Sequence, residues 1–129
     1  MRSLKNSEIE KLLIDFPDWD YQDNALTKEF KFDNFKECMS VVFRIAFECE
    51  KLNHHPYWSN TFNLLKIKLS THDAGGITEL DFKLAESIEI FFFFMVIFHN
   101  FKKNIRHEVT LFLSCIFFNF YKVQQVFKS

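Results

Sequence analysis

The sequence predicts an α+β fold, with one four-stranded antiparallel sheet and three helices packed on one face in the order αββαββα. Two observations predict it. A long apolar stripe at helical spacing occupies the middle of the chain, and a pair of alternating, strand-like segments lies on each side of it. The 129 residues suffice for a domain with a buried core.

The first predicted helix covers residues 7–16. Ser7 and Glu10 stand at capping-box spacing, apolar residues then step by three and four, and Pro17 ends the element. The stretch WDYQDNALTKEFKF, residues 19–32, predicts a hairpin with its turn at Asp23 and Asn24, because aromatic and apolar residues alternate on both sides.

The second predicted helix has Asp33 as its N-cap and is about five turns long. Its expected buried face consists of residues spaced by three and four, namely Phe35, Cys38, Val42, Ile45, Cys49 and Leu52. Val41, Phe43 and Phe47 add apolar surface beyond that stripe. This extra surface is a candidate contact for another subunit.

Two further strands are expected in YWSNTFNLL, residues 57–65, and in LLKIKLST, residues 64–71, where apolar residues alternate with lysines. The following HDAGG contains both glycines of the chain, which indicates positive φ or a close backbone approach. Thr78 is the predicted N-cap of the third helix, with Asp81 at its N3 position. The expected apolar side of that helix holds Leu80, Leu84, Ile88 and Phe91.

Composition excludes several classes of protein. The net charge is -1, and the sequence has no basic cluster of the kind that binds nucleic acid directly. The three cysteines, Cys38, Cys49 and Cys115, are odd in number and lack CxxC spacing, which favours a reducing compartment. The N-terminal residues lack the apolar segment of a signal peptide. The expected location is the cytoplasm, with the nucleus as a second location.

The candidate chemistry lies where the second helix ends. Glu50, His54 and His55 stand there, His72 follows the last strand, and Asp81 opens the third helix. If that strand returns beside the helix end, three imidazoles and two carboxylates come together. Such a cluster suits general acid–base catalysis near neutral pH.

Other interpretations of these residues stay open at this point. Taken singly, the His54-His55 pair is typical of solvated or hydrogen-bonded histidines. Asp81, taken singly, is typical of a carboxylate that stabilises the start of a helix. A zinc site is disfavoured, because adjacent histidines would have to direct both rings at one ion. Cys38 and Cys49 are expected to be small core residues rather than nucleophiles, and neither a P-loop nor a dinucleotide motif occurs.

The run EKLNHHPYWSNTFNLLKIKLSTHDAGGITELDFKLA, residues 50–85, resembles the pterin-4a-carbinolamine dehydratase family. The family pattern is an acidic residue, His-His-Pro, an aromatic residue, a Thr-His pair that ends a strand and an Asp that opens a helix. All of these stand here, as Glu50, His54, His55, Pro56, Trp58, Thr71, His72 and Asp81. With the upstream elements, the similarity covers about residues 7–90.

The resemblance implies dehydration of 4a-hydroxytetrahydrobiopterin to quinonoid dihydrobiopterin, without a metal or organic cofactor. It implies that His54 and His72 act as acid and base, that His55 binds the pterin and assists, and that Glu50 and Asp81 orient imidazoles. The expected substrate-binding residues are Asn53, Pro56, Trp58, Ser70, Thr71 and Asp73. Two departures from the family, Asn53 in place of Asp and Leu80 in place of Arg, are expected to weaken substrate binding.

The resemblance also implies partners. A homo-oligomer, either a dimer or a tetramer, is the favoured assembly. The alternative function is a non-catalytic interaction protein, because an animal member of the family serves as a dimerisation cofactor for a homeodomain transcription factor. Both roles would use the long second helix.

The C-terminal part of the chain departs from the family. Residues 1–90 are expected to form the dehydratase-like domain and residues 91–129 an extension, because eleven of the nineteen phenylalanines lie from Ile88 onward. Neither apolar run there reaches the roughly 18 residues of a membrane span. An added helical pair, a membrane-surface or hairpin anchor, and a translation of normally non-coding sequence are the alternatives, and the last is favoured. Phe91 to Phe94 is expected to promote aggregation.

Overall fold

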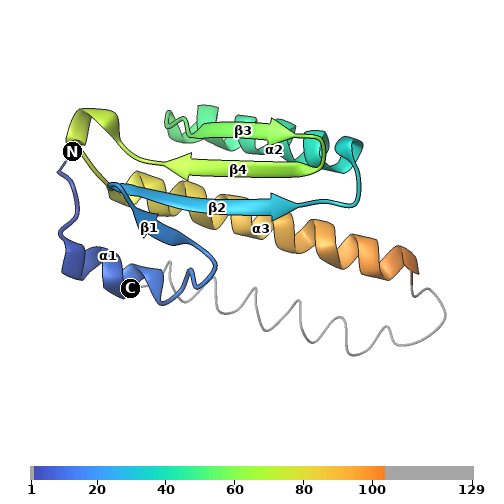
Figure 1. The fold of residues 1–129 in the computed structure, drawn as a ribbon, viewed down its shortest axis with the longest axis horizontal. Helices are drawn as coiled ribbons and strands as arrows, with labels where there is room; N and C mark the ends of the chain where they lie inside the picture. Colours follow the sequence, from blue (N-terminus) through green and yellow to red (C-terminus); the bar gives the residue numbers. More distant parts are fainter. Residues whose placement is uncertain (1, 104–129) are drawn as a thin grey trace. The chain divides into compact units, whose positions relative to one another are not determined.

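The computed structural model describes residues 2–103, including all side chains except those of residues 98, 99, 102 and 103. The predicted α+β class and the order αββαββα are confirmed (Figure 1). The elements in chain order are α1 (Asn6–Leu13), β1 (Asp20–Gln22), β2 (Ala25–Lys31), α2 (Phe35–Leu52), β3 (Tyr57–Thr61), β4 (Leu64–Leu69), the short 3-10 helix η1 (His72–Ala74) and α3 (Glu79–Lys103).

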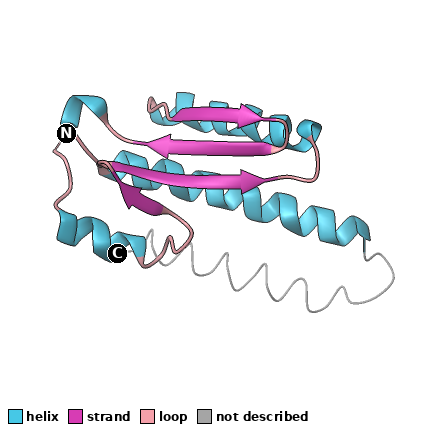
Figure 2. Ribbon diagram, in the orientation of Figure 1, coloured by secondary structure: helices cyan, strands magenta, loops and turns pink. Residues whose placement is uncertain are grey.

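The sheet has the strand order β1-β2-β4-β3, and every neighbouring pair is antiparallel. In the central pair, Leu26 lies opposite Leu69 and Phe30 lies opposite Leu65, and all four side chains are buried. The long helices α2 and α3 both cover this face of the sheet (Figure 2). Lys66 and Lys68 alternate with the buried residues of β4 and are exposed on the other face, as the alternation predicts.

Both hairpins have a turn at a residue with positive φ. Asp23 and Asn24, at φ 53° and 55°, make the two-residue turn that the sequence predicts between β1 and β2. Between β3 and β4, Phe62 has φ 53°, and the side-chain amide of Asn60 donates to the carbonyls of Phe62 (3.0 Å) and Leu64 (2.8 Å). This turn ends β3 at Thr61, earlier than predicted, whereas β4 begins at Leu64 as predicted and ends two residues early, at Leu69.

The predicted capping of α1 is wrong. The helix begins at Asn6 and ends at Leu13, and the carboxylate that caps it belongs to Glu8 rather than Glu10. Glu8 Oε2 accepts from the Lys5 backbone N–H at 2.8 Å, and the Arg2 guanidinium binds both oxygens of the same carboxylate, at 2.9 and 2.7 Å. Two sets of donors thus select Glu8, and the helix starts earlier than the Ser7 pattern indicates.

Two predictions for α2 are also corrected. Its N-cap is Asn34, not Asp33, because Asn34 Oδ1 accepts from the Glu37 backbone N–H at 3.1 Å. The buried stripe passes through Val41, which is buried, whereas Phe35 in the first turn is 47% exposed and Val42 is only partly buried. The observed stripe of Cys38, Val41, Ile45 and Cys49 follows the period of the helix, with steps of three, four and four residues.

The third helix begins as predicted, directly after Thr78, and extends to Lys103. Its buried residues include Phe82, Leu84, Ala85 and Ile88. Phe92 packs its ring on those of Phe30 and Phe32, with centroid distances of 5.0 and 5.8 Å. Part of the phenylalanine run therefore completes the core of the sheet–helix layer.

The chain divides into two compact units, Met1–Met95 and Val96–Ser129. The first contains the whole sheet, and the described part of the second is the end of α3. The predicted division at residue 90 stays a prediction, and the alternatives for residues 104–129 lie outside the described residues. Within residues 2–103, no helix is both long and apolar enough to cross a membrane.

Candidate active site

The end of α2 turns the chain sharply at Asn53. This residue has left-handed backbone, with φ 46° and ψ 44°, a conformation that Asn adopts more readily than most residues. The next backbone N–H, that of His54, donates to the carbonyl of Cys49 at 3.0 Å. This helix end directs the His54 side chain inward, where the residue is only 8% exposed.

The loop between β4 and α3 presents Thr71 to the same place. Thr71 and Gly76 form an isolated antiparallel bridge around η1, and Gly75 has φ 68°, as the glycine pair predicts. The loop is also held from the N-terminus of the chain, because the Leu4 N–H donates to the Ile77 carbonyl at 2.7 Å. These bonds fix the loop between Thr71 and Thr78 on both sides.

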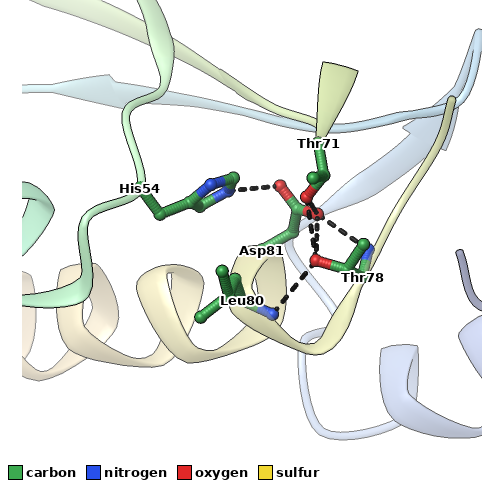
Figure 3. A network of polar contacts seen from close by, with 5 residues as sticks. All are labelled: His54, Thr71, Thr78, Leu80 and Asp81. Carbon is green, nitrogen blue, oxygen red and sulfur yellow. Dashed lines mark hydrogen bonds and ion pairs between the residues drawn. The ribbon is translucent and has the colours of Figure 1, made fainter. Parts of the chain in front are cut away.

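Asp81 lies at the centre of the resulting polar network (Figure 3). Its side chain is fully buried. Its Oδ1 lies 2.7 Å from His54 Nε2, and its Oδ2 accepts from the Thr78 backbone N–H and from the Thr71 hydroxyl, each at 2.8 Å. The carboxylate therefore joins the end of α2, the end of β4 and the start of α3.

The other predicted carboxylate, Glu50, pairs with the other adjacent histidine. Glu50 Oε1 lies 2.8 Å from His55 Nε2. Both side chains are exposed, Glu50 by 78% and His55 by 59%. The two carboxylates predicted to orient imidazoles each contact one imidazole, but in contrasting environments: one pair is buried and the other faces solvent.

The third predicted histidine, His72, lies on η1 with a fully exposed side chain. Its Nδ1 is 3.8 Å from Asp73 Oδ1, and the Asp73 side chain is fully exposed as well. The contacts of the described residues thus bring His54, Thr71 and Asp81 together, and leave His55 with Glu50 and His72 with Asp73 as separate pairs.

The remaining predicted site residues differ in exposure. Asn53 and Ser70 are exposed, and Pro56 and Trp58 are partly buried. Trp58 lies opposite Ile67 in the sheet and packs against the core, so its indole lies on the helix-covered face. Asn53 also has a backbone role, because it supplies the left-handed residue that ends α2.

Sequence reasoning missed the part that Thr78 plays in this network. Thr78 was predicted only as a helix cap, yet it is fully buried, and its hydroxyl lies 2.8 Å from that of Thr71. The signal that could have indicated this contact is the spacing of Thr78 and Asp81, which places a cap hydroxyl beside a buried carboxylate.

The cysteines behave as core residues, as predicted. Cys38 and Cys49 are both buried and free. Burial raises the pKa of the Cys38 thiol, and it raises that of Cys49 to about 11, so neither is an activated nucleophile. Cys115 lies outside the described residues. In the described part of the chain, no group of three or more His, Cys, Asp and Glu side chains is placed to hold a metal ion.

Comparison with known proteins finds relatives over the part of the chain that contains the network. The family model for pterin 4 alpha carbinolamine dehydratase matches residues 2–91, which include every residue of the network. A protein of Christiangramia forsetii assigned to the pterin-4-alpha-carbinolamine dehydratases is 52% identical over 89 residues, which are 69% of this chain and 92% of that protein. A Prochlorococcus marinus protein with the same assignment is 49% identical over 89 residues, or 68% of this chain and 93% of its own.

A solved structure agrees as well. The crystal structure of a protein from Brucella melitensis, described as a transcriptional coactivator/pterin dehydratase, superposes with a TM-score of 0.67 at 35% identity. The match covers 69% of this chain and 97% of that one. Because the family pattern, the relatives and the fold agree over the same residues, the chain belongs to the pterin-4a-carbinolamine dehydratase family, a family of hydro-lyases.

Proposed function

We propose that the protein dehydrates 4a-hydroxytetrahydrobiopterin to quinonoid dihydrobiopterin by histidine general acid–base catalysis, in the recycling of tetrahydrobiopterin in the cytoplasm. The observation that supports this most directly is the buried contact between His54 Nε2 and Asp81 Oδ1, at 2.7 Å. A buried carboxylate–imidazole pair holds the ring in one orientation and stabilises the imidazolium that forms when the ring takes a proton.

The reaction needs two proton transfers. The bond between C4a and its hydroxyl oxygen breaks, and the oxygen leaves as water after it receives a proton. The N5–H bond gives up its proton, and its electron pair forms the C4a=N5 double bond. One group must therefore act as an acid and another as a base, which two histidines can supply near neutral pH.

The environments of the histidines suggest their roles. His54 is the better candidate for the base at N5, because its Nε2 contacts the buried Asp81 carboxylate, which holds the ring in one orientation. His72 is fully exposed and can exchange protons with solvent, which suits the acid that protonates the leaving hydroxyl. His55, paired with exposed Glu50, is assigned to binding the pterin. Asn53, Ser70, Thr71 and Asp73 are the proposed polar contacts of the substrate, beside Pro56 and Trp58.

The test is turnover of 4a-hydroxytetrahydrobiopterin by the full chain and by single alanine variants. We expect His54→Ala and His72→Ala each to lower kcat by about 100-fold or more, as loss of a general acid or base does. Lys36→Ala is the control, because Lys36 is exposed in the first turn of the 18-residue helix α2, about 24 Å from the last residue of that helix. Unchanged turnover in both histidine variants would contradict the proposal.

A second property follows from the exposed face of α2. Phe43 and Phe47 stand one turn apart on this helix and are 67% and 73% exposed. Two such rings on one helix face are costly to leave in water. We propose that a second copy of the chain covers them in a dimer or tetramer.

Light scattering coupled to size-exclusion chromatography tests this assembly. We expect the double variant Phe43→Glu/Phe47→Glu to shift the oligomer to a smaller species. Phe62→Glu is the matched control, because Phe62 is similarly exposed, at 65%, but lies in the turn between β3 and β4. An assembly that survives the double variant would place the contact elsewhere.

The alternative function is a non-catalytic interaction protein that acts as a transcription cofactor. The description of the Brucella melitensis protein as a transcriptional coactivator/pterin dehydratase supports the cofactor role, but it names the enzyme activity as well. The two functions separate in the histidine variants. An enzyme loses turnover in His54→Ala and His72→Ala, whereas an interaction protein keeps its partner in both. Partner binding abolished by Phe43→Glu/Phe47→Glu but retained in the histidine variants would support the cofactor role.

A further inference from the structure

We infer that Thr78 is a positioning residue for His54. Acting through Thr71 and Asp81, Thr78 keeps the ring proton of neutral His54 on Nε2. The other ring nitrogen, Nδ1, is then the atom that exchanges a proton with the substrate. The inference rests on the proposed function for the identity of the substrate alone. The observations that support it are the six contacts of the buried network in Figure 3.

The direction of each hydrogen bond follows from counting protons. The Leu80 backbone N–H can only donate, and it points at Thr78 Oγ1, 3.3 Å away. Thr71 has a single hydroxyl proton and donates it to Asp81 Oδ2 at 2.8 Å. The 2.8 Å contact between the two threonine oxygens therefore takes the proton of Thr78, whose other acceptor, Asp81 Oδ2, is farther away at 3.3 Å. The bonds run in one direction, from Leu80 through Thr78 and Thr71 to Asp81.

This direction decides what Asp81 offers to His54. Its Oδ2 already accepts from the Thr71 hydroxyl and from the Thr78 backbone N–H, both at 2.8 Å. A carboxylate has no proton to donate, so Asp81 can only accept hydrogen bonds. At the 2.7 Å contact, His54 Nε2 must consequently be the donor. The ring then carries its Nε2 proton whether it is neutral or protonated.

The other ring nitrogen is left for chemistry. The structure gives His54 Nδ1 no hydrogen-bond partner among the described residues. Over the same part of the chain, every fully buried side-chain nitrogen or oxygen has a hydrogen-bond partner. Because Nδ1 has no partner, it is not fully buried, although the residue is otherwise buried. Nδ1 is the atom of His54 that can take the N5 proton of a bound pterin, and Asp81 lies on the opposite side of the ring.

The experiment reads the tautomer directly. Long-range proton–nitrogen NMR spectra of the full chain, labelled with 15N-histidine, distinguish a protonated from an unprotonated ring nitrogen, and His54→Ala assigns the signals. In the wild type above the titration of the ring, we expect Nε2 protonated and Nδ1 unprotonated. Thr78→Val keeps the branched shape but removes the hydroxyl contacts to Thr71 Oγ1, at 2.8 Å, and to Asp81 Oδ2, at 3.3 Å. In this variant we expect the Nδ1–H tautomer to become populated.

The controls separate positioning from folding. Thr78→Ser restores a hydroxyl and should restore the wild-type tautomer. Thr27→Val makes the same change on β2, outside the network, and should leave the spectrum of His54 unchanged. If Thr78→Val does not fold because it loses its cap, Thr71→Val decides the matter, since it removes a hydroxyl from the network and keeps the Leu80 contact to Thr78.

Turnover of 4a-hydroxytetrahydrobiopterin gives the second readout. We expect Thr78→Val to lower kcat about tenfold with KM within about twofold, and Thr78→Ser to recover most of the loss. A wild-type His54 protonated at Nδ1, or a tautomer that survives both valine substitutions, would overturn the inference. Absence of turnover in the wild type would instead overturn the proposed function, because the tautomer is measured without substrate.

Discussion

The carboxylate of Asp81 is fully buried, and its Oδ1 lies 2.7 Å from Nε2 of His54, which is itself 8% exposed. Glu50, four residues before His54, makes a similar contact with His55, at 2.8 Å, but both of these side chains are exposed to solvent. Because their surroundings differ so much, we expect the two pairs to differ greatly in their effect on turnover. A charge interaction is strong where water is excluded and weak where it is not.

The buried pair is tested by Asp81→Asn. An amide that accepts from Thr71 and Thr78 must present its NH₂ group to His54, which forces the ring nitrogen there to become an acceptor. We expect kcat for 4a-hydroxytetrahydrobiopterin to fall at least about 100-fold, the size of effect that a wrong tautomer produces. Circular dichroism is the control for folding. Turnover near that of the wild type would show that the pair does not orient a catalytic ring.

The exposed pair is tested by Glu50→Gln. Exposed ion pairs contribute at most about 1 kcal/mol, so turnover should change by less than about fivefold. The loss should also shrink as salt is added, because ions screen exposed charges. A loss as large as that of Asp81→Asn would mean that Glu50 contacts the substrate.

Lys28 is the subject of a stability prediction. Its side chain is 9% exposed, and its ammonium lies 2.6 Å from Glu89 Oε1, which also accepts from the Trp19 indole at 2.9 Å. Lys28→Met leaves the partly buried Glu89 without its charge partner. We expect it to lower the free energy of unfolding in urea by about 2 kcal/mol.

The matched control for Lys28 is Lys66→Met, on the open face of the sheet. Lys66 pairs across β2 and β4 with exposed Glu29, so its loss should change the free energy of unfolding by less than about 0.5 kcal/mol. Equal effects of the two substitutions would contradict the importance of the Lys28–Glu89 contact.

Acid should remove the contribution that the contact between Arg2 and Glu8 makes to the stability of the folded protein. Hydrogen bonds from the Arg2 guanidinium, and then one from the Lys5 backbone, lower the pKa of Glu8 from 4.5 to about 2 in the folded protein. Since the folded pKa is the lower one, the stabilisation is complete above pH 4.5 and is lost as the pH falls toward 2. Melting temperatures of the wild type and Glu8→Gln should differ at pH 7 and converge near pH 2.

Glu10→Gln is the control for that experiment, because the structure assigns the cap to Glu8 rather than to Glu10. Its melting temperature should follow that of the wild type over the whole range. If Glu10→Gln were the variant with the larger deficit at pH 7, the observed start of α1 would be contradicted.

The buried cysteines should resist thiol reagents. Burial raises the pKa of Cys49 to about 11, so at pH 8 only about one thiol in a thousand would be ionised even if the reagent reached it. In Cys115→Ser, which leaves Cys38 and Cys49, we expect no labelling of the native protein by Ellman's reagent and two thiols after denaturation. Rapid labelling of the native protein would show that α2 opens from the sheet.

Much of the fold was predictable, because local chemistry decides it. The turn at Asp23 and Asn24, the alternation in β4 and the cap at Thr78 each depend on a few neighbouring residues, and all three are confirmed. Two of the errors lie at helix starts. Glu8 replaces Glu10 because Arg2, outside the helix, also binds it, and Asn34 replaces Asp33 because either side chain could have capped α2.

The sequence alone determined the fold class and the family, since these follow from periodicity and from a pattern of residue types. The residues proposed to carry the chemistry are a prediction from the same pattern. Only the tertiary structure decided which carboxylate meets which imidazole. His54 and Asp81 are 27 positions apart, and their contact forms only when β3 and β4 return the chain to the end of α2. Glu50 contacts His55 locally, at the end of α2, and both side chains stay exposed to solvent. Burial, which separates the two pairs, is a property of the packed layers and not of the local sequence.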